Sequence, residues 1–373
     1  MFYSEKEARL LVIEAAKRLL HAGLVARTWG NLSARISDTQ FVITPSGLSY
    51  EIMEPKDLVK VNISDCSYEG SLKPSSEKGI HADAYRLRPE AAFVIHTHQE
   101  AASIYGIAGK ALSDMDSRQL GQFVPCAAYG MPSTNTLRNA VADVLQKYLQ
   151  ANAVFMKYHG ALCIGKDCED AFSTASELEK VCRDRIADAM KVPESTLTSP
   201  EDLGRSVRRR NMFCLKLHGI KKIYHLNNLP KNAPLAVRIH ASIYRHTNAR
   251  FILWKSSDAI RSISESGKCL SPYLEDLIQI AGVTIRCASH PDPSEITKKL
   301  RGRNAVLIRD NGVLCTGKTQ DDVTAVGILT EKGCKAALFA KSRTDCQPVG
   351  SVDALIQRIV YVRKYARKKE ART

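Results

Sequence analysis

The chain contains an internal repeat, and this feature restricts its fold more than any other. Residues 152–182 (NAVFMKYHGALCIGKDCEDAFSTASELEKVC) align without a gap with residues 304–334 (NAVLIRDNGVLCTGKTQDDVTAVGILTEKGC). A second pair of segments, 80–98 and 239–256, aligns with one residue deleted. Because the paired segments are similarly spaced in both copies, the chain is predicted to hold two domains of one fold.

The boundary between the copies is expected near 195–215, where Pro, Ser and a basic run interrupt the apolar periodicity. We therefore expect a first domain at 1–205 and a second at 206–373, the second ending in a basic C-terminal helix. The second copy is the shorter one, because fewer residues precede its first aligned segment. The basic run itself, RSVRRR at 205–210, is expected to be a solvated linker.

Helical and strand-like patterns alternate within each copy, which predicts an α/β fold. No Gly-rich phosphate fingerprint follows a strand, so a nucleotide-binding fold is not expected. In the first copy the patterns predict helices over 7–24, 77–88 and 167–190, strands over 41–47 and 91–98, and a hairpin over 153–165.

The net charge of +15 predicts anionic partners, either phosphorylated metabolites or nucleic acid. No zinc finger, RNA-recognition signature or aromatic-plus-basic stripe is present, so we expect no nucleic-acid partner. We expect no membrane partner either, because no apolar run is long enough to span a bilayer. Acidic residues in the N-terminal apolar pattern predict an amphipathic helix rather than a signal peptide, and 11 cysteines without a Cys-x-x-Cys pair favour reduced thiols in the cytoplasm.

Three histidines form a candidate metal site. His96 and His98 are one residue apart at the end of an apolar run, so a strand would point both rings to the same face. The pair alone is also compatible with two polar residues at a sheet edge. His159 precedes a Gly at another strand end, and three imidazoles at one cation leave an open coordination position, as in catalytic zinc sites.

The second copy provides an internal control for this hypothesis. In the aligned frame it carries Trp254, Ser256 and Asn311 in place of the three histidines. Because the surrounding residues persist while all three histidines are lost together, we infer that the histidines act as a unit. The first copy is therefore predicted to bind a metal ion, and the second is not.

Further polar residues lie in loops of the first copy. Ser75 and Ser76 precede a helix that begins near Glu77, and helix N-termini attract phosphate. Serine is equally an ordinary N-cap, and a carboxylate in the first turn is favoured by the helix dipole alone. The loops TWGNLSAR (28–35) and ITPSG (43–47) expose backbone N–H groups but are also compatible with ordinary turns. In the second copy the polar trio is replaced by Pro234, Leu235 and Ala236.

Taken in order, these segments resemble the class II aldolase/adducin family over roughly residues 5–190. The pattern is most similar to that of fuculose-phosphate and rhamnulose-phosphate aldolases, with ribulose-phosphate 4-epimerase as a sibling. The resemblance implies an α/β three-layer domain, with a central, mostly antiparallel sheet flanked by helices, in a tandem repeat whose second copy is shortened and degenerate. Its motifs are G-N-x-S-x-R (Gly30–Arg35), I-T-P-S-G (Ile43–Gly47), P-S-S-E (Pro74–Glu77), H-x-H (His96, His98) and H-G (His159, Gly160).

The family implies roles for these residues. The three histidines would hold Zn²⁺ or another divalent cation, and Glu77 would be the general base, with a pKa raised by its surroundings. The epimerase sibling carries Asp at the Glu77 position, which favours the lyase reaction here. A ketose 1-phosphate, such as a deoxy-sugar phosphate, would be cleaved to dihydroxyacetone phosphate and an aldehyde through a Zn-stabilised enediolate. The substrate phosphate would be bound by Asn31, Ser46, Gly47, Ser75 and Ser76.

The chain departs from the aldolase pattern in one loop. The aldolases use a tyrosine, donated across a subunit boundary, as proton donor for the leaving aldehyde, and the matching loop 109–123 has none. Asp114 or Asp116 would serve instead, as an Asp does in the epimerase, or Tyr273 from the second copy. The family forms four-fold rings, so we expect a homo-oligomer, either a tetramer or a dimer whose fused copies complete a pseudo-tetramer.

Two alternatives remain open at this stage. An epimerase, decarboxylase or dehydratase of the same family would share the metal-dependent chemistry. A metabolite-binding or scaffold protein without catalysis belongs to a different class, and an intact Glu77 together with the three histidines argues against it.

Overall fold

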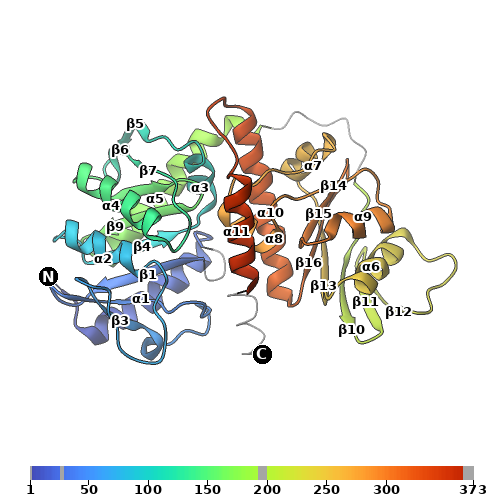
Figure 1. Cartoon of the computed structure of the whole chain (residues 1–373), viewed down its shortest axis with the longest axis horizontal. Helices are drawn as coiled ribbons and strands as arrows, with labels where there is room; N and C mark the ends of the chain where they lie inside the picture. The colour runs from blue at the N-terminus through green and yellow to red at the C-terminus, as the bar shows by residue number, and fades with distance from the viewer. Residues whose placement is uncertain (1, 26–28, 192–199, 364–373) are drawn as a thin grey trace. The chain divides into compact units, whose positions relative to one another are not determined.

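The computed structural model describes residues 2–25, 29–191 and 200–363. The chain divides into two compact units, Met1–Ala187 and Asp188–Thr373 (Figure 1). Each unit contains a seven-stranded sheet, with strand orders β3-β2-β1-β4-β9-β8-β7 and β12-β11-β10-β13-β16-β15-β14. Equivalent strands occupy equivalent places in the two orders, which confirms that the sequence repeat is a repeat of one fold.

The first unit runs from the N-terminal helix to the long helix that closes its sheet. Its elements are α1 (Glu5–His21), β1 (Gly30–Arg35), β2 (Gln40–Ile43), η1 (Pro55–Asp57), β3 (Val59–Asn62), α2 (Lys78–Leu87), β4 (Phe93–Thr97), α3 (Glu100–Gly106), β5 (Leu112–Ser117), β6 (Gly121–Val124), β7 (Cys126–Ala127), α4 (Asn135–Lys147), β8 (Ala153–Met156), β9 (Gly160–Gly165) and α5 (Cys168–Ile186).

The second unit repeats the seven sheet strands and the helices between them, and adds α8 and a C-terminal helix. Among its described residues it has no counterpart of α1, η1 or the β5–β6 ribbon. Its elements are η2 (Asp188–Met190), β10 (Arg205–Arg209), β11 (Met212–Leu217), β12 (Ile220–His225), α6 (Leu235–His246), β13 (Phe251–Lys255), α7 (Asp258–Glu265), α8 (Glu275–Ala281), β14 (Cys287–Ala288), α9 (Pro293–Leu300), β15 (Ala305–Ile308), β16 (Gly312–Gly317), α10 (Gln320–Lys341) and α11 (Ser351–Tyr361).

Both sheets are mostly antiparallel and covered by helices, as the resemblance implied. Only the outermost pairs, β7–β8 and β14–β15, are parallel, because a helix crosses over between their strands. In the first unit α2 and α4 pack together on one face, whereas α1, α3 and α5 pack against the other parts of the sheet and one another. Central strands β4 and β9 are therefore buried along their whole length, which explains their continuous apolar sequences.

The core forms where amphipathic helices meet the sheet. Ile80 of α2 and Val141 of α4 lie in one buried cluster with Val94 and Leu162 from the central strands. Each fully buried aliphatic side chain of this kind stabilises the fold by roughly 1.5–3 kcal/mol. The helices begin at defined caps: the hydroxyl of Thr134, for example, accepts a hydrogen bond from a backbone N–H in the first turn of α4.

The basic run at 205–210 is not a linker, contrary to the sequence-based expectation. Residues Arg205–Arg209 form strand β10, which pairs with β11 on one side and β13 on the other. The alternation of side chains explains this, because Ser206 is buried while Arg205 and Arg209 are exposed. The run therefore belongs to the second sheet, and the two compact units divide earlier, after Ala187.

Candidate metal and acid–base site

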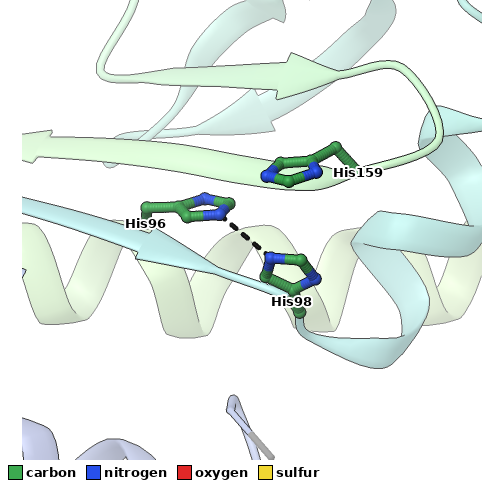
Figure 2. A group of neighbouring side chains, drawn as sticks. All are labelled: His96, His98 and His159. Carbon is green, nitrogen blue, oxygen red and sulfur yellow. Dashed lines mark hydrogen bonds between the residues drawn. The ribbon is translucent and has the colours of Figure 1, made fainter. Parts of the chain in front are cut away.

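The three predicted histidines come together in the first unit (Figure 2). His96 lies in β4, His98 follows its last residue, and His159 lies in the turn between β8 and β9. The ring centroids are 4.8 Å apart for His96–His98, 4.9 Å for His96–His159 and 4.7 Å for His98–His159. One nitrogen from each ring lies within 4.8 Å of the other two. This is the only such cluster of His, Cys, Asp or Glu side chains among the described residues.

Local backbone geometry places the rings. In the pairing of β4 with β9, His96 is opposite Leu162 and Thr97 is opposite Ala161, so the two histidine-bearing segments are neighbours. Gly160 permits this close approach, because a Cβ at that position would lie 2.1 Å from the backbone oxygen of Thr97. Backbone packing therefore requires a glycine directly after His159.

His96 is held in the tautomer that suits a metal ligand. Its Nδ1 lies 2.9 Å from the backbone oxygen of Ala161, and because a carbonyl oxygen only accepts, Nδ1 must carry the proton. The Nε2 lone pair then faces the other rings, 3.1 Å from Nε2 of His98. Burial lowers the pKa of His96 well below its usual range, so the ring is neutral and free to ligate.

The arrangement fits a divalent cation of the zinc type. Tetrahedral zinc with nitrogen ligands requires ligand atoms about 3.3 Å apart, close to the separation of the His96 and His98 nitrogens. His96 and His159 are 1% and 3% exposed, whereas His98 is partly exposed and marks the side from which a ligand would enter. Three imidazoles that leave a fourth position open are a donor set found at catalytic zinc sites.

Glu77, the N-cap of α2, places a carboxylate beside the three histidines. Its two oxygens lie 2.9 Å from Nε2 of His159 and 3.4 Å from Nε2 of His96, and a third contact, 2.8 Å long, comes from the Asn31 amide. Burial by itself would raise the pKa of Glu77, but the two histidines and the Asn31 amide lower it well below its usual range. The expectation of a raised pKa is therefore wrong for this arrangement, because the electrostatic effect of His96 and His159 and the hydrogen bonds from His159 and Asn31 outweigh burial.

A hydrogen-bonded chain behind Glu77 fixes its position. Nε2 of His81 is 2.5 Å from the Asn31 side-chain oxygen, and Nδ1 is 2.6 Å from the hydroxyl of Ser33. The hydroxyl of Tyr85 lies 2.7 Å from that of Ser33. Because the amide must direct its N–H toward the carboxylate, its oxygen accepts from His81, which leaves Nδ1 to accept from Ser33.

Sequence reasoning missed this chain, although a signal existed. The segments 80–85 and 239–244 share Ile-His-Ala and a Tyr four residues after the His. In the second unit Ser206 lies 2.6 Å from Nδ1 of His240 and 2.7 Å from the hydroxyl of Tyr244, so the Ser–His–Tyr part persists without the metal ligands. It is therefore scaffold, and Asn31 is the member that connects the scaffold to the site.

The second unit also shows what replaces Asn31. In the first unit the strand partner of His96 is Asn31. Trp254 is the counterpart of His96, and its backbone N–H donates to the backbone oxygen of Gly204, so Gly204 occupies the Asn31 position. Nε2 of His240 makes no hydrogen bond within the described residues, and only the nearby Leu203 backbone favours its protonated form. Gly204 has φ +72°, and a Cβ there would lie 2.5 Å from a backbone oxygen, so the strand has no room for an asparagine.

The two predicted phosphate-binding loops lie side by side. An isolated antiparallel β-bridge pairs Pro45 with Pro74, so the two loops are adjacent, with Ser46 next to Lys73 and Ser75 next to Thr44. Backbone hydrogen bonds from Ser46 and Ser75 to the opposite loop hold the pair together. The hydroxyl of Ser76 accepts a 2.8 Å hydrogen bond from Ser133, at the wall of a cavity of about 110 Å³ that Glu77 also lines.

The remaining predicted residues differ in what the structure says of them. Asn31 is buried and its amide already contacts Glu77 and His81, so its predicted contact with phosphate would use its remaining N–H. Asp116 lies in β5, and its side chain is outside the described residues. Tyr273 lies in the second unit, just before α8. The roles of these residues stay predictions.

In the second unit the three histidine positions form a hydrogen-bonded cluster of a different kind. Nε1 of Trp254 donates to the side-chain oxygen of Asn311 over 2.8 Å, and the hydroxyl of Ser256 donates to the Asn311 backbone oxygen over 3.0 Å. Trp254 is opposite Leu314, as His96 is opposite Leu162, which confirms the aligned frame. The indole thus occupies the space where the first unit places its imidazoles.

Comparison with known proteins gives the following matches. A family model described as Class II Aldolase and Adducin N-terminal domain matches the chain twice, over residues 11–186 and 198–338. An L-fuculose 1-phosphate aldolase structure is 26% identical with a TM-score of 0.46, and the match covers 50% of this chain and 88% of that one. YgbL from Escherichia coli, a candidate aldolase/epimerase/decarboxylase, is 23% identical with a TM-score of 0.44, covering 52% and 95% of the two chains. The L-fuculose-1-phosphate aldolase from Thermus thermophilus is 22% identical with a TM-score of 0.42, covering 49% and 95% of the two chains.

Among the described residues, no helix has the length and apolar character needed to cross a membrane.

Proposed function

The chain belongs to the class II aldolase and adducin family, and we propose that its first unit is a metal-dependent aldolase. The substrate class is a ketose 1-phosphate, such as a deoxy-sugar phosphate, cleaved to dihydroxyacetone phosphate and an aldehyde. One observation carries the proposal: the Glu77 carboxylate lies 2.9 Å from His159 and 3.4 Å from His96, next to the cluster of three converging imidazoles. A general base and a cation site therefore face the same small volume.

The three histidines would hold the cation. When bound, a divalent ion such as Zn²⁺ supplies Lewis-acid stabilisation of the negative charge that develops on the substrate during carbon–carbon bond cleavage. Nδ1–H of His96 donates a hydrogen bond to the backbone oxygen of Ala161, and this bond orients the ring. His98, the most exposed of the three, leaves the open side on which a substrate would approach.

Glu77 would exchange the proton at the carbon that becomes nucleophilic. It accepts this proton in the condensation direction and donates it in the cleavage direction. The lowered pKa keeps the carboxylate ionised at neutral pH, which is the form that condensation requires. Asn31 holds one carboxylate oxygen through its 2.8 Å contact, and His81 holds Asn31, so the direction of the carboxylate is fixed before substrate binds.

The paired loops would bind the substrate phosphate. The Pro45–Pro74 bridge joins the two loops that carry Ser46, Gly47, Ser75 and Ser76, and the second loop leads into the start of α2, the end of a helix that attracts phosphate. Phosphate binding at this place would set the distance between the phosphate end of the substrate and Glu77.

The aldehyde oxygen needs a proton partner, and Asp116 and Tyr273 are our proposed candidates. Asp116 belongs to the first unit, whereas Tyr273 would act from the second unit of the same or another chain. The second case connects catalysis to assembly, as a homotetramer or as a dimer whose fused copies make a pseudo-tetramer. The native mass in solution tests the assembly, and a monomeric mass would contradict it.

The activity is tested with purified full-length protein loaded with Zn²⁺ and offered a panel of ketose 1-phosphates. Formation of dihydroxyacetone phosphate is the expected result. Glu77→Gln should keep its metal in elemental analysis while turnover falls by roughly 10²-fold or more. Glu51→Gln, which changes an exposed carboxylate in the same unit, is the control and should keep both.

Other outcomes of the same panel assign the alternatives. Inversion of a sugar-phosphate stereocentre without cleavage would identify an epimerase, and loss of carbon dioxide or water would identify a decarboxylase or dehydratase. Tight ligand binding without any turnover, by the unmodified protein and by Glu77→Gln alike, would favour a metabolite-binding or scaffold role. If the loaded protein does not retain stoichiometric metal, every metal-dependent reaction named here would be contradicted.

A further inference from the structure

The second unit contains a large basic cavity that the proposed reaction does not use. It has a volume of about 880 Å³ and lies where the end of α6, the loop between α9 and β15, and α11 meet. No Asp or Glu is among the residues that line it. Its basic lining residues, named here the arginine pocket, are Arg245, His246, Arg301, Arg303, Arg358 and Arg363.

Comparison of the two units shows how this space arose. In the first unit the residue that caps the C-terminus of α2 is Arg88, which is buried and donates to the backbone oxygens of Tyr148 and Ala151 over 2.7 Å and 3.0 Å. In the second unit the corresponding C-cap of α6 is Thr247, whose short side chain bonds back to its own helix. One guanidinium group that fills the space in the first unit is therefore absent from the second.

The loop on the other side of the cavity also differs between the two units, because only the second unit has arginines in it. The segment that follows α4 reads Leu149-Gln150-Ala151-Asn152, and the aligned segment after α9 reads Arg301-Gly302-Arg303-Asn304. In the first unit the positive charge is therefore on Arg88, at the end of α2, and the loop that it contacts has no arginine. The second has arginines on the loop and on α11, around an open space.

The arginines of the pocket are anchored by neutral acceptors. Arg303 donates to the backbone oxygen and hydroxyl of Thr284 over 2.6 Å and 3.0 Å, and Arg358 donates to the backbone oxygen of Gln279 over 2.5 Å. Within the described residues, none of the pocket arginines forms an ion pair with a carboxylate. By contrast, the partly buried Arg138 of the first unit is paired with Asp83 over 2.6 Å.

The positive charges of the pocket oppose one another. Arg303 and Arg358 are only partly exposed, and burial lowers the pKa of each. The charge of Arg303 lowers the pKa of Arg358 further, and both side chains line the same cavity. An anion between them would relieve this repulsion and accept paired N–H bonds, the geometry in which arginine binds phosphate best.

We propose that the arginine pocket binds a small organic molecule carrying two or more phosphate groups, of the nucleoside diphosphate class. The volume is in the range of small-molecule sites, about 300–1,000 Å³. Leu300, Ile359 and Val362 line the same cavity and offer an apolar surface for a ring next to the charged end. The cavity is open to solvent, but its basic residues surround one hollow of this size instead of following a long flat surface, which favours a small ligand over RNA. The proposal is independent of the reaction assigned to the first unit.

The test is calorimetric titration of the full-length chain with ADP and with inorganic pyrophosphate at low and at physiological salt. Arg301→Gln with Arg363→Gln removes two exposed cations from the pocket and is expected to weaken ADP binding at least tenfold. Lys221→Gln with Lys222→Gln removes the same charge from the exposed strand β12 and should change binding less than twofold. Equal weakening by both pairs, or no binding of either probe at millimolar concentration, would overturn the proposal.

A further variant separates a built cavity from general attraction by charge. Thr247→Arg restores the residue of the first unit and should fill the space from within. If the cavity is the site, this variant weakens ADP binding although it adds a positive charge. If it strengthens binding instead, or if a single-stranded RNA oligonucleotide displaces ADP at lower concentration than free ADP does, the basic surface acts without a pocket and the proposal is wrong.

Discussion

A drop from pH 7 to pH 5 should destabilise the second unit by about 2 kcal/mol through one buried side chain, His240. The ring projects from the buried face of α6 into the core, and burial lowers its pKa from 6.5 to about 3. The groups that face it are neutral: the hydroxyls of Ser206 and Tyr244 and the Leu203 backbone. No carboxylate is among these contacts to stabilise an imidazolium.

The sign and size follow from proton linkage. The unfolded chain takes up this proton near pH 6.5, whereas the native unit takes it up only near pH 3. Between these values the unfolded state binds more protons, so the free energy of unfolding decreases as the pH falls. Over the step from pH 7 to pH 5 the difference amounts to about 1.4 pKa units, or about 2 kcal/mol at 1.36 kcal/mol per unit. Below pH 5 carboxylates such as Glu295, whose pKa is lowered by the Ser289 backbone, begin to contribute as well.

The assay uses the two tryptophans of the chain, one in each unit. Trp29→Phe leaves Trp254, a residue of the second unit, as the only indole. Urea unfolding followed by Trp254 fluorescence at pH 7, 6 and 5 gives the free energy of unfolding of that unit. The midpoint should move to lower urea concentration at each step, with most of the change between pH 6 and pH 5.

His240→Asn in the same background identifies the responsible group. The asparagine keeps a polar atom near Ser206 but cannot titrate, so the loss of stability between pH 7 and pH 5 should shrink by about 2 kcal/mol. His246→Asn changes an exposed histidine at the end of the same helix and should leave the pH dependence as it was. If the His240→Asn protein loses as much stability with pH as its parent does, the linkage argument is refuted.

Three substitutions give further expected outcomes. His159→Asn, the residue found in the second unit, should reduce bound metal from stoichiometric to near zero in elemental analysis, whereas Asn311→Ala should leave the metal content unchanged. Gly160→Ala places a Cβ 2.1 Å from the Thr97 backbone oxygen, so it should destabilise the first unit by about 1–3 kcal/mol in thermal unfolding and lower metal retention. Arg88→Thr removes two hydrogen bonds from a buried guanidinium to backbone carbonyls, and chemical denaturation should show a loss of roughly 2–4 kcal/mol.

The site could be predicted from sequence where a short-range rule applied. Side-chain alternation along a strand was enough to place His96 and His98 on one face, and the His-Gly pair at a hairpin indicated the third ring. The repeat supplied a comparison within the chain, because the second copy changed all three positions together. These inferences depend on neighbours in sequence or on aligned segments, so no distances were needed.

Other features depended on contacts between distant residues. The direction of the Glu77 pKa shift is set by His96, His159 and Asn31, and which influence dominates depends on distances of a few ångströms. A carboxylate in an apolar pocket and one surrounded by donors have the same sequence signature. The expectation of a raised pKa was wrong for this reason.

The sequence by itself determined that this chain holds two copies of one fold and that only the first carries the histidines and the glutamate, because periodicity and internal alignment are properties of the order of residues. The tertiary structure alone decided that β10 is a strand and not a linker, that His81 supports Asn31 behind Glu77, and that arginines from separate elements of the second unit line one cavity. Each of these depends on which side chains far apart in the chain come within hydrogen-bonding or Coulomb range, and that is fixed only when the sheets and helices have packed.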